Sequence, residues 1–429
     1  MRDHKQITLH SVEEFKIQLL TWAQQFEDIV WLDSNLYQHT HSSYDSILAV
    51  DAFTAIQTDS VNGFKKLKEY QSITKDWIFR YLSYDLKNDT EPLKSDNFDG
   101  LDFPDLCFFQ PKKLFLFKDD TLIIRYLNFI SDEVDADLKS IETFSIQTDS
   151  SNKNDIQIES RISKKQYINK VSTLLSHIHR GDIYEANFCQ EFYAQADLDP
   201  LETYFKLNKI SQPPFATFLK TGDKFLLSSS PERYLKKVGL EITSQPIKGT
   251  TRRSDFIEED AELKSILETD PKERSENIMI VDLVRNDLSK IAQKGTVKVT
   301  ELCQIYSFKQ VHHMISTVQA KALPTISAVD IIAATFPMGS MTGAPKISAM
   351  KIIEDLEEAK RGLYSGAVGY FTSDGDFDFN VVIRSILYNA SKPYISFSVG
   401  SAITSKSTAE KEYQECLVKA KAMRSVLEN

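Results

Sequence analysis

The sequence lacks the features that mark several large classes of protein. It has no long run of basic residues and a formal net charge of −10, so nucleic acid and anionic membranes are disfavoured as main partners. No stretch is long and apolar enough to span a membrane, and the N-terminus has no apolar core of signal-peptide length. The four cysteines are far apart and form no C-x-x-C pair, which predicts neither a zinc site nor a disulfide framework. We therefore expect a cytoplasmic protein.

One polar stretch, residues 145–167, interrupts the chain. It is rich in Ser, Asn and Asp and is typical of a linker or an exposed loop. The 429 residues are enough for two domains or one large composite domain, and a 41% hydrophobic content can fill a sizeable core. We therefore divide the chain into an N-terminal region, residues 1–155, and a C-terminal region, residues 156–429.

The hydrophobic periodicity predicts an α+β fold. Runs of alternating apolar residues indicate strands that look antiparallel, and they are mixed with helices in no regular β–α–β order. Strand patterns cover residues 112–127, 185–195, 225–238, 296–320, 362–389 and 393–403. Helical patterns cover residues 167–182, 270–292, 326–336, 346–360 and 408–427.

Two of the predicted helices each carry two glutamates spaced three residues apart. Glu273 and Glu276 form one pair, and Glu412 and Glu415 form the other, so each pair lies on one face of its helix. Brought together, the two faces would make an oxygen-rich site suited to Mg²⁺. Each pair also has an ordinary explanation, because Asp270 to Glu273 has the pattern of a helix start and Glu415 can pair with a lysine one turn on.

Lys248 is an unexpected residue in a short, rigid stretch, "SQPIKGTTRR". Pro246 fixes its own φ and Gly249 can adopt conformations that other residues avoid. A lysine is not needed to build such a loop. It is either one of the many loop lysines that face water or a side chain directed at a ligand.

Three further stretches are candidates for chemistry. The loop that opens a helix at "GSMTGAPKISAM" could favour an anion, but its glycines are four apart and Ile347 follows Lys346, so it is no Walker loop. Glu232, at a strand end, could be a general acid or a salt-bridged residue. His312 and His313 should point to opposite faces of a strand, with one of them inward as a core histidine.

Taken together, these fragments resemble the chorismate-utilising enzymes. The stretches "SSSPERYL", "PIKGTTRR", "DPKERSENIMIVDLVRNDLSKIA", "GSMTGAPK", "RGLYSGAVGYF" and "EKEYQE" occur in the order and spacing of that family, over about residues 167–427. The family includes component I of anthranilate synthase and of aminodeoxychorismate synthase, and the isochorismate and salicylate synthases. The resemblance implies large stacked antiparallel β-sheets flanked by helices, in an α/β/β/α order, with the active site in a central cleft. It also implies that residues 1–155 are a divergent N-terminal region and that residues 156–429 bind chorismate.

The resemblance also suggests a role for Lys248. The loop reads Pro-Ile-Lys-Gly-Thr in aminodeoxychorismate synthases and has alanine at this position in anthranilate synthases. In the implied reaction the lysine amine attacks ring carbon two of chorismate, the hydroxyl on carbon four leaves, and ammonia adds at carbon four and expels the lysine. The product is 4-amino-4-deoxychorismate, for para-aminobenzoate and folate biosynthesis. Since the attacking lysine must be neutral, we expect burial or nearby cations to lower its pKa.

The same resemblance implies roles for other residues. Glu232 would protonate the departing hydroxyl. Glu276 and Glu415 would bind Mg²⁺ directly, and Glu273 and Glu412 through water. The implied substrate contacts are Gly249, Thr250, His313, Ser340, Tyr364, Arg384, Gly400, Ala402 and Lys419.

Two positions depart from the family pattern. Ala402 replaces a glycine of a Gly-Ala-Gly-Ile strand end, where a positive φ would be strained. Glu185 stands where relatives usually have Gln, or Lys in the isochorismate-forming enzymes, which disfavours isochorismate and salicylate formation. Anthranilate synthase component I is the main alternative, disfavoured by Lys248. A non-catalytic relative is disfavoured because the matched acidic and basic positions are all filled.

No glutaminase Cys-His-Glu set is recognisable in the sequence. We therefore expect ammonia to come from a separate glutamine amidotransferase subunit, or from free ammonia. Chorismate and ammonia would be the substrates.

Overall fold

The computed structural model describes residues 2–35, 37, 43–144, 156–309 and 311–428. The strands are β1 (Arg2–Thr8), β2 (Asp28–Asp33), β3 (Ser46–Thr58), β4 (Ile78–Leu82), β5 (Leu106–Lys118), β6 (Thr121–Leu127), β7 (Glu159–Ser160), β8 (Glu185–Gln195), β9 (Phe215–Thr221), β10 (Lys224–Ser230), β11 (Arg233–Val238), β12 (Glu241–Gln245), β13 (Ile247–Arg252), β14 (Lys298–Ser307), β15 (Val311–Lys321), β16 (Gly343–Ala344), β17 (Ala367–Phe371), β18 (Phe377–Val381), β19 (Ser385–Asn389) and β20 (Tyr394–Thr404). The helices are α1 (Val12–Trp22), α2 (Gly63–Thr74), α3 (Lys87–Thr90), α4 (Val134–Thr143), α5 (Lys164–Arg180), α6 (Pro200–Ser211), α7 (Ile257–Thr269), α8 (Pro271–Ser289), α9 (Ala328–Thr335), α10 (Lys346–Leu356) and α11 (Ala409–Leu427).

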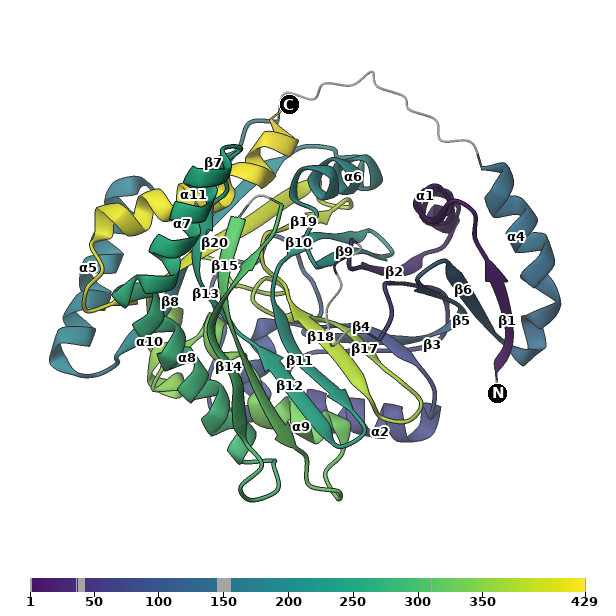
Figure 1. Cartoon of the computed structure of the whole chain (residues 1–429), viewed down its shortest axis with the longest axis horizontal. Helices are drawn as coiled ribbons and strands as arrows, with labels where there is room; N and C mark the ends of the chain where they lie inside the picture. The colour runs from purple at the N-terminus through teal and green to yellow at the C-terminus, as the bar shows by residue number, and fades with distance from the viewer. Residues whose placement is uncertain (1, 36, 38–42, 145–155, 310, 429) are drawn as a thin grey trace.

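The long strands β3 and β5 pair with each other and join two antiparallel sheets (Figure 1). The first sheet continues from β3 through β2, β9, β10, β19 and β20 to β8. The second continues from β5 through β4, β17, β18, β11 and β12 to β15, which also pairs with β13 and β14. The predicted α+β class with stacked antiparallel sheets is therefore confirmed.

Apolar side chains on the two faces of the first sheet belong to two separate hydrophobic cores. Val30 and Leu226 belong to a core that also contains residues of the second sheet, such as Leu235. The next residues along these two strands, Trp31 and Leu227, belong to a second core that they share with α1, α5, α6 and α11. Because successive side chains of a strand point to opposite faces, one core fills the space between the sheets and the other lies under a layer of helices.

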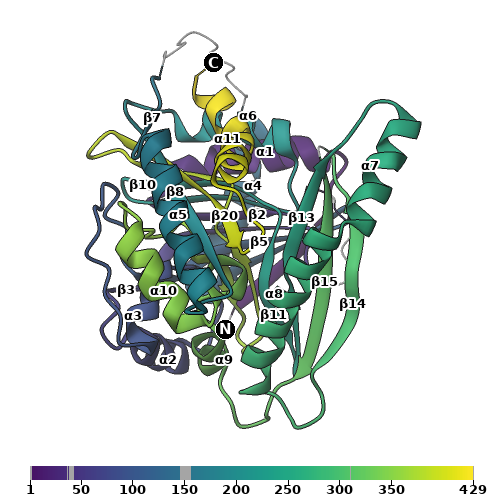
Figure 2. The same ribbon diagram turned by 90° about the vertical axis from the view of Figure 1, so that its left-hand side faces the viewer.

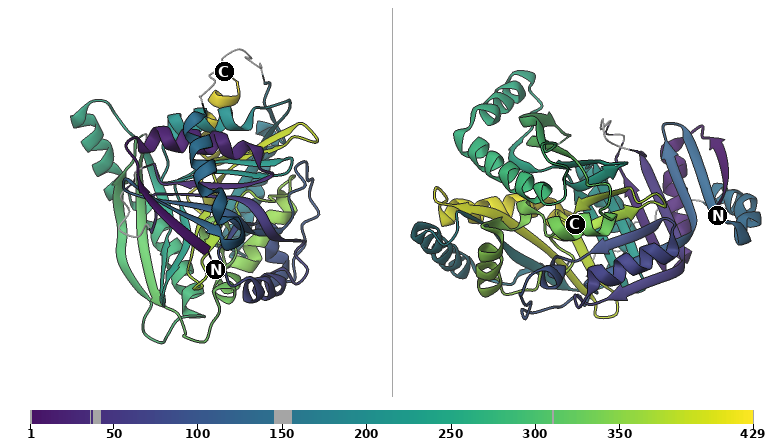
Figure 3. Two further views of the ribbon diagram at one scale, coloured as in Figure 1. Left: turned by 90° about the vertical axis from the view of Figure 1, so that its right-hand side faces the viewer. Right: turned by 90° about the horizontal axis from the view of Figure 1, so that it is seen from below.

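Helices α7 and α8 form the opposite layer, next to β13, β14 and β15 (Figure 2). Helix α11 runs beside β20, in a different helix layer from α8. The N-terminal turns of α8 and α11 nevertheless approach each other, at Lys272 and Glu412. Strand β1 and helix α4 lie at the far end of the molecule from α11 (Figure 3). In the described part of the chain, no helix is long and apolar enough to cross a membrane.

Several predicted boundaries need correction. The polar stretch at 145–167 ends early, since Ser163 caps α5 through Gln166 and the helix starts at Lys164; residues 145–155 lie outside the described part. Helix α10 ends at Leu356, short of the predicted residue 360. The strand predicted at 225–238 is divided between β10 and β11. The β2–β9 and β4–β17 ladders join the N-terminal and C-terminal regions within the sheets, and the division at residue 155 stays a prediction.

Candidate active site

Lys248 lies in a bulge at the start of β13. The pairing of β13 with β15 shifts register between Ile247 and Thr250, and Gly249 has a φ of +100°, which disfavours other residues. A side chain at Gly249 would also meet Glu273 Oε2 at 3.3 Å. Asn277 donates from its side-chain amide to the Lys248 carbonyl at 3.2 Å. The bulge therefore holds Lys248 in place against helix α8.

The amine of Lys248 is paired with a buried carboxylate. Lys248 Nζ donates to Glu185 Oε1 at 3.0 Å, and the side chains of these two residues are 16% and 2% exposed. Burial lowers the pKa of the Lys248 amine, but the charges of Glu185 and Glu276 outweigh it and raise the pKa above its usual value. The expected lowering of this pKa is therefore wrong. Lys248 is nevertheless not a solvated loop lysine.

Glu232 lies in the turn between β10 and β11 and is buried. Burial raises the pKa of its carboxyl to about 7, against the opposing influence of the Ser340 hydroxyl, the charge of Lys248 and the backbone N–H of Ile247. A carboxyl group with such a pKa is available as an acid near neutral pH. Glu232 and Ser340 line the same cavity, and the charge of Lys248 acts on the Glu232 carboxyl.

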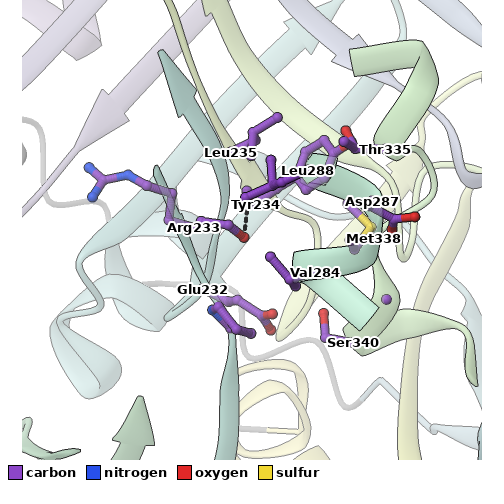
Figure 4. A pocket seen from close by; sticks show the side chains of 13 residues that line it. Glu232, Arg233, Tyr234, Leu235, Val284, Asp287, Leu288, Thr335, Met338 and Ser340 are labelled. Carbon is purple, nitrogen blue, oxygen red and sulfur yellow. Dashed lines mark hydrogen bonds between the residues drawn. The ribbon is translucent and has the colours of Figure 1, made fainter. Parts of the chain in front are cut away.

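Glu232 and Ser340 face a small cavity bounded by β11 and α8 (Figure 4). Its other walls are largely apolar, including Val284 and Leu288. The neighbouring Arg233 points away from the cavity (Figure 4) and pairs with Asp378 at 2.9 Å. Of the two charged side chains in this turn, Glu232 therefore faces the cavity and Arg233 does not.

The loop that carries Ser340 is held by Lys346. The Lys346 amine pairs with Asp287 at 2.5 Å and donates to the carbonyls of Thr335 and Pro337 at 3.2 and 2.9 Å. The "GSMTGAPK" stretch is therefore an ordinary loop–helix junction in which the lysine braces the loop. The possible anion site at this helix start has no lysine left to support it.

Helices α8 and α11 bring the four predicted glutamates together. Lys272 Nζ lies 3.8 Å from Glu276 Oε1 and 3.7 Å from Glu412 Oε1, so carboxylates of both helices share one cation. Glu415 pairs with Lys419 at 2.7 Å, and the charge of Glu415 also acts on Glu273. The two pairs, far apart in the sequence, thus form one acidic cluster.

This acidic cluster is short of positive charge. Burial raises the pKa of Glu276 to about 7 despite the charges of Lys248 and Lys272. Glu276 Oε1 is buried without a hydrogen-bond partner. Within the described residues, no three acidic, His or Cys side chains stand close enough to surround a metal ion as they are. The oxygen ligands and the unpartnered oxygen nevertheless fit a hard divalent cation, provided that the partly exposed Lys272 moves aside.

Two of the predicted substrate contacts, His313 and Arg384, line a second hollow together with Pro231. Thr250 Oγ1 and His313 Nδ1 lie 2.8 Å apart, and burial followed by the charge of Arg384 lowers the pKa of His313 to about 3. His313 is therefore a neutral ring beside a cation, which suits a site for an anionic ligand.

Gly400, Ala402 and Lys419 lie together at the C-terminal end of β20 and on α11. Lys419 donates to the Gly400 carbonyl at 2.9 Å, and a side chain at Gly400 would come within 2.5 Å of Cys189 Sγ. Ala402 pairs with Asn187 in a regular antiparallel ladder and has no positive φ. The strain considered for an alanine at this position is therefore absent.

The histidine prediction was half correct. His312 and His313 do point to opposite sides, but both are buried, because α7 covers the outer face of β15. His312 Nε2 lies 3.0 Å from Asp260 on α7, and its Nδ1 lies 2.8 Å from Ser307. Only His313 reaches the site.

One buried ion pair near the site was not anticipated. Arg361 donates to Glu357 and to the carbonyls of Met341 and Asn187, at 2.6 and 2.7 Å. It thereby ties the Ser340 loop to β8. The sequence offers only an i, i+4 Glu–Arg spacing as a signal, which many surface helices share.

Comparison with known proteins agrees with this geometry. Residues 26–425 match the family described as chorismate binding enzyme. The chain is 38% identical over 270 residues to aminodeoxychorismate synthase component 1 of Escherichia coli, covering 63% of this chain and 59% of that protein. It is 33% identical over 391 residues to anthranilate synthase component 1 of Saccharolobus solfataricus, covering 88% of each. The E. coli match thus spans less than two thirds of that relative.

A solved structure of a related enzyme has a similar fold. Anthranilate synthase component I from Streptococcus pneumoniae superposes with a TM-score of 0.77 at 26% identity, covering 90% of this chain and 94% of that one. The predicted fold is confirmed by this likeness. Together with the match over residues 26–425, it shows that the chain belongs to the family of chorismate binding enzymes.

Proposed function

We propose that this chain converts chorismate and ammonia to 4-amino-4-deoxychorismate, as the first component of an aminodeoxychorismate synthase. The observation that carries the proposal is the placement of Lys248. Its side chain is only 16% exposed and pairs with Glu185 at 3.0 Å, and the charge of its amine lowers the pKa of Glu232. A nucleophile next to an acid is what substitution of a ring hydroxyl requires.

In the first half of the reaction, the neutral amine of Lys248 forms a bond to ring carbon two. The conjugated double bonds of the ring shift, and the bond between carbon four and its hydroxyl breaks. Glu232 gives its proton to the departing oxygen, which leaves as water. The pKa of about 7 for Glu232 keeps much of this group in the acid form near neutral pH.

In the second half, ammonia forms a bond to carbon four. The double bonds shift back, and the bond between carbon two and Lys248 breaks, which frees the lysine. The ammonium ion that supplies ammonia gives its extra proton to Glu232 and so restores the acid. The amino group ends on carbon four.

The ring carboxylate would be bound at the acidic cluster and the facing cations. Mg²⁺ would be held by Glu276 and Glu415 directly and by Glu273 and Glu412 through water, and it would supply positive charge for the carboxylate. Arg384 and Lys419 add fixed positive charge, and Tyr364 adds a hydroxyl. Ser340 and His313 border the ring.

Ammonia would come from a glutamine amidotransferase partner. The motivation is the name "component 1" of the E. coli relative and the absence of a recognisable glutaminase triad from the sequence. The purified chain should use ammonium salts but should use glutamine only with such a partner. Efficient use of glutamine by the chain alone would contradict this part of the proposal.

The test is product identification after incubation with chorismate, ammonium chloride and MgCl₂. Mass and chromatographic retention should match 4-amino-4-deoxychorismate. Formation of anthranilate would favour the alternative function, anthranilate synthase component I. The S. solfataricus relative supports this alternative because it matches 88% of this chain. Isochorismate as the product would contradict both assignments.

A further inference from the structure

Glu185 is held more firmly than a solvated surface residue would be. It begins β8, and its backbone pairs with Ala344 of β16 on one side and Thr404 of β20 on the other. A side chain at Gly343 would come within 2.2 Å of the Glu185 carbonyl, so the close approach of β16 requires glycine. The position of the Glu185 carboxylate is therefore fixed by two strands.

Within the part of the chain that the structure describes, one charged side chain pairs with this carboxylate. Oε1 accepts a hydrogen bond from Lys248 at 3.0 Å, whereas Oε2 is buried without a hydrogen-bond partner. Among the described residues, Glu185 is in turn the one carboxylate within ion-pair distance of the Lys248 amine. A proton leaving Lys248 therefore has one acceptor within direct reach.

We propose that Glu185 positions Lys248: the Glu185 carboxylate orients the Lys248 amine and accepts its proton before the amine attacks the ring. This inference rests on the proposed function. Glu232 cannot take this proton, because it must itself carry one for the departing hydroxyl. The acidic cluster is beyond ion-pair distance of Lys248.

The physical reason is the loss of water when a substrate fills the site. An ammonium–carboxylate pair is stable where solvent and further hydrogen bonds support both charges, and Oε2 lacks such support. Exclusion of water weakens the charged pair relative to the neutral amine and carboxylic acid. Chorismate binding would thus move the proton from Nζ to the carboxylate and produce the nucleophile where it is needed.

Lys248 and Glu185 end each turnover in the protonation states in which they began it. Lys248 ammonium and Glu185 carboxylate become amine and carboxylic acid, and the amine lone pair forms the bond to carbon two. When ammonia later displaces the lysine, the electrons of the carbon–nitrogen bond return to Nζ as a neutral amine. Glu185 then returns its proton to Nζ, so that the starting pair is restored without any other reactant.

The test compares Glu185→Gln with Glu191→Gln, which changes another buried, ion-paired glutamate of β8, one bound to Arg161. The rate of adduct formation on Lys248 is followed by peptide mass spectrometry with chorismate and MgCl₂, in the absence of ammonia. Glu185→Gln keeps the shape of the side chain and an oxygen that can orient the amine. We expect its adduct to form at least about tenfold more slowly, with the KM for chorismate changed less than about threefold. Glu191→Gln should behave like the wild type.

A second measurement separates proton acceptance from structure. Acetylation of Lys248 by a small reagent, in the absence of chorismate, should be faster in Glu185→Gln, because loss of the carboxylate leaves more of the amine neutral. Faster acetylation together with slower adduct formation, in a variant whose urea unfolding matches that of Glu191→Gln, separates loss of the proton acceptor from a structural defect. Unchanged adduct formation in a folded Glu185→Gln variant overturns the inference. No adduct in the wild type contradicts the covalent step of the proposed function instead.

Discussion

The buried carboxylates at the two ends of the site differ in how closely cations pair with them. At one end, Glu185 meets one cation, Lys248, at 3.0 Å. At the other end, Glu276 of α8 and Glu412 of α11 share Lys272 at 3.8 and 3.7 Å, and the buried Oε1 of Glu276 has no hydrogen-bond partner.

This difference separates what the fold supplies from what a ligand must supply. The Lys248 end is matched in charge, and its chemistry needs only rearrangement of protons already present. The acidic cluster holds more negative charge than its lysines balance, so it is suited to a divalent cation and an anionic substrate group. Variants at the first end should change bond making, and variants at the second end should change the binding of Mg²⁺.

The largest effect is expected for Lys248→Ala. Loss of the nucleophile should lower the rate of 4-amino-4-deoxychorismate formation by on the order of 10⁴-fold or more, as measured by chromatography with ammonium chloride. Any residual amination should move to carbon two. A wild-type rate with the same product would show that Lys248 is not involved in the reaction.

Stability provides the control for this variant. Lys248→Ala leaves Glu185 buried without its partner, which costs about 3–5 kcal/mol of unfolding free energy for typical buried pairs. The double variant Lys248→Ala/Glu185→Gln removes both charges and should recover most of that loss in urea unfolding. If the double variant is as inactive as the single one but stable, misfolding does not explain the loss of activity.

The second effect concerns Glu232. Glu232→Gln should lower kcat by about 10²–10⁴-fold, because the amide cannot protonate the departing hydroxyl. In the wild type, kcat/KM should fall as the pH rises above about 7, since deprotonation removes the acid. In Glu232→Gln this alkaline fall should disappear. An unchanged pH profile in the variant would assign the acid to another group.

A smaller effect is expected for Glu276→Gln. Loss of one carboxylate should weaken Mg²⁺ binding by about 10–100-fold, measured by calorimetric titration with MgCl₂. The matched control is Glu410→Gln, because Glu410 is an exposed residue of α11 that pairs with Lys164. Equal weakening in both variants would argue for a general charge effect instead of a site.

The smallest effect is expected for Lys272→Ala. The Lys272 amine lies between Glu276 and Glu412, where it competes with a divalent cation. Its removal should tighten Mg²⁺ binding by about two- to fivefold, which matches the weak interaction of a partly exposed ion pair. Weaker binding in this variant would mean that the lysine supports the site.

Much of the local structure could be predicted from the sequence. The Asp270 cap of α8, the Gly181 end of α5 and the turn at Gly375 all follow from short-range rules. The i, i+3 glutamate pairs were visible as single faces. That α8 and α11 meet came only from the family resemblance, because helix periodicity says nothing about which helices become neighbours.

The electrostatics of Lys248 could not be predicted. Its partner Glu185 is 63 positions away in the sequence, and the pair forms because the strands on either side of β8 fix that carboxylate. Burial alone suggested a lowered pKa, but the nearby carboxylates reverse the direction. The sign of such a shift depends on the tertiary neighbours, which no local pattern contains.

The most direct test of the central claim is to trap the covalent intermediate. The wild-type chain is incubated briefly with chorismate and MgCl₂ without ammonia, quenched and digested, and the peptide that contains Lys248 is analysed by mass spectrometry. The account predicts an added mass of chorismate less water on Lys248, which disappears when ammonium chloride is added before the quench. An unmodified Lys248 peptide, from protein that makes 4-amino-4-deoxychorismate once ammonium is supplied, would contradict it.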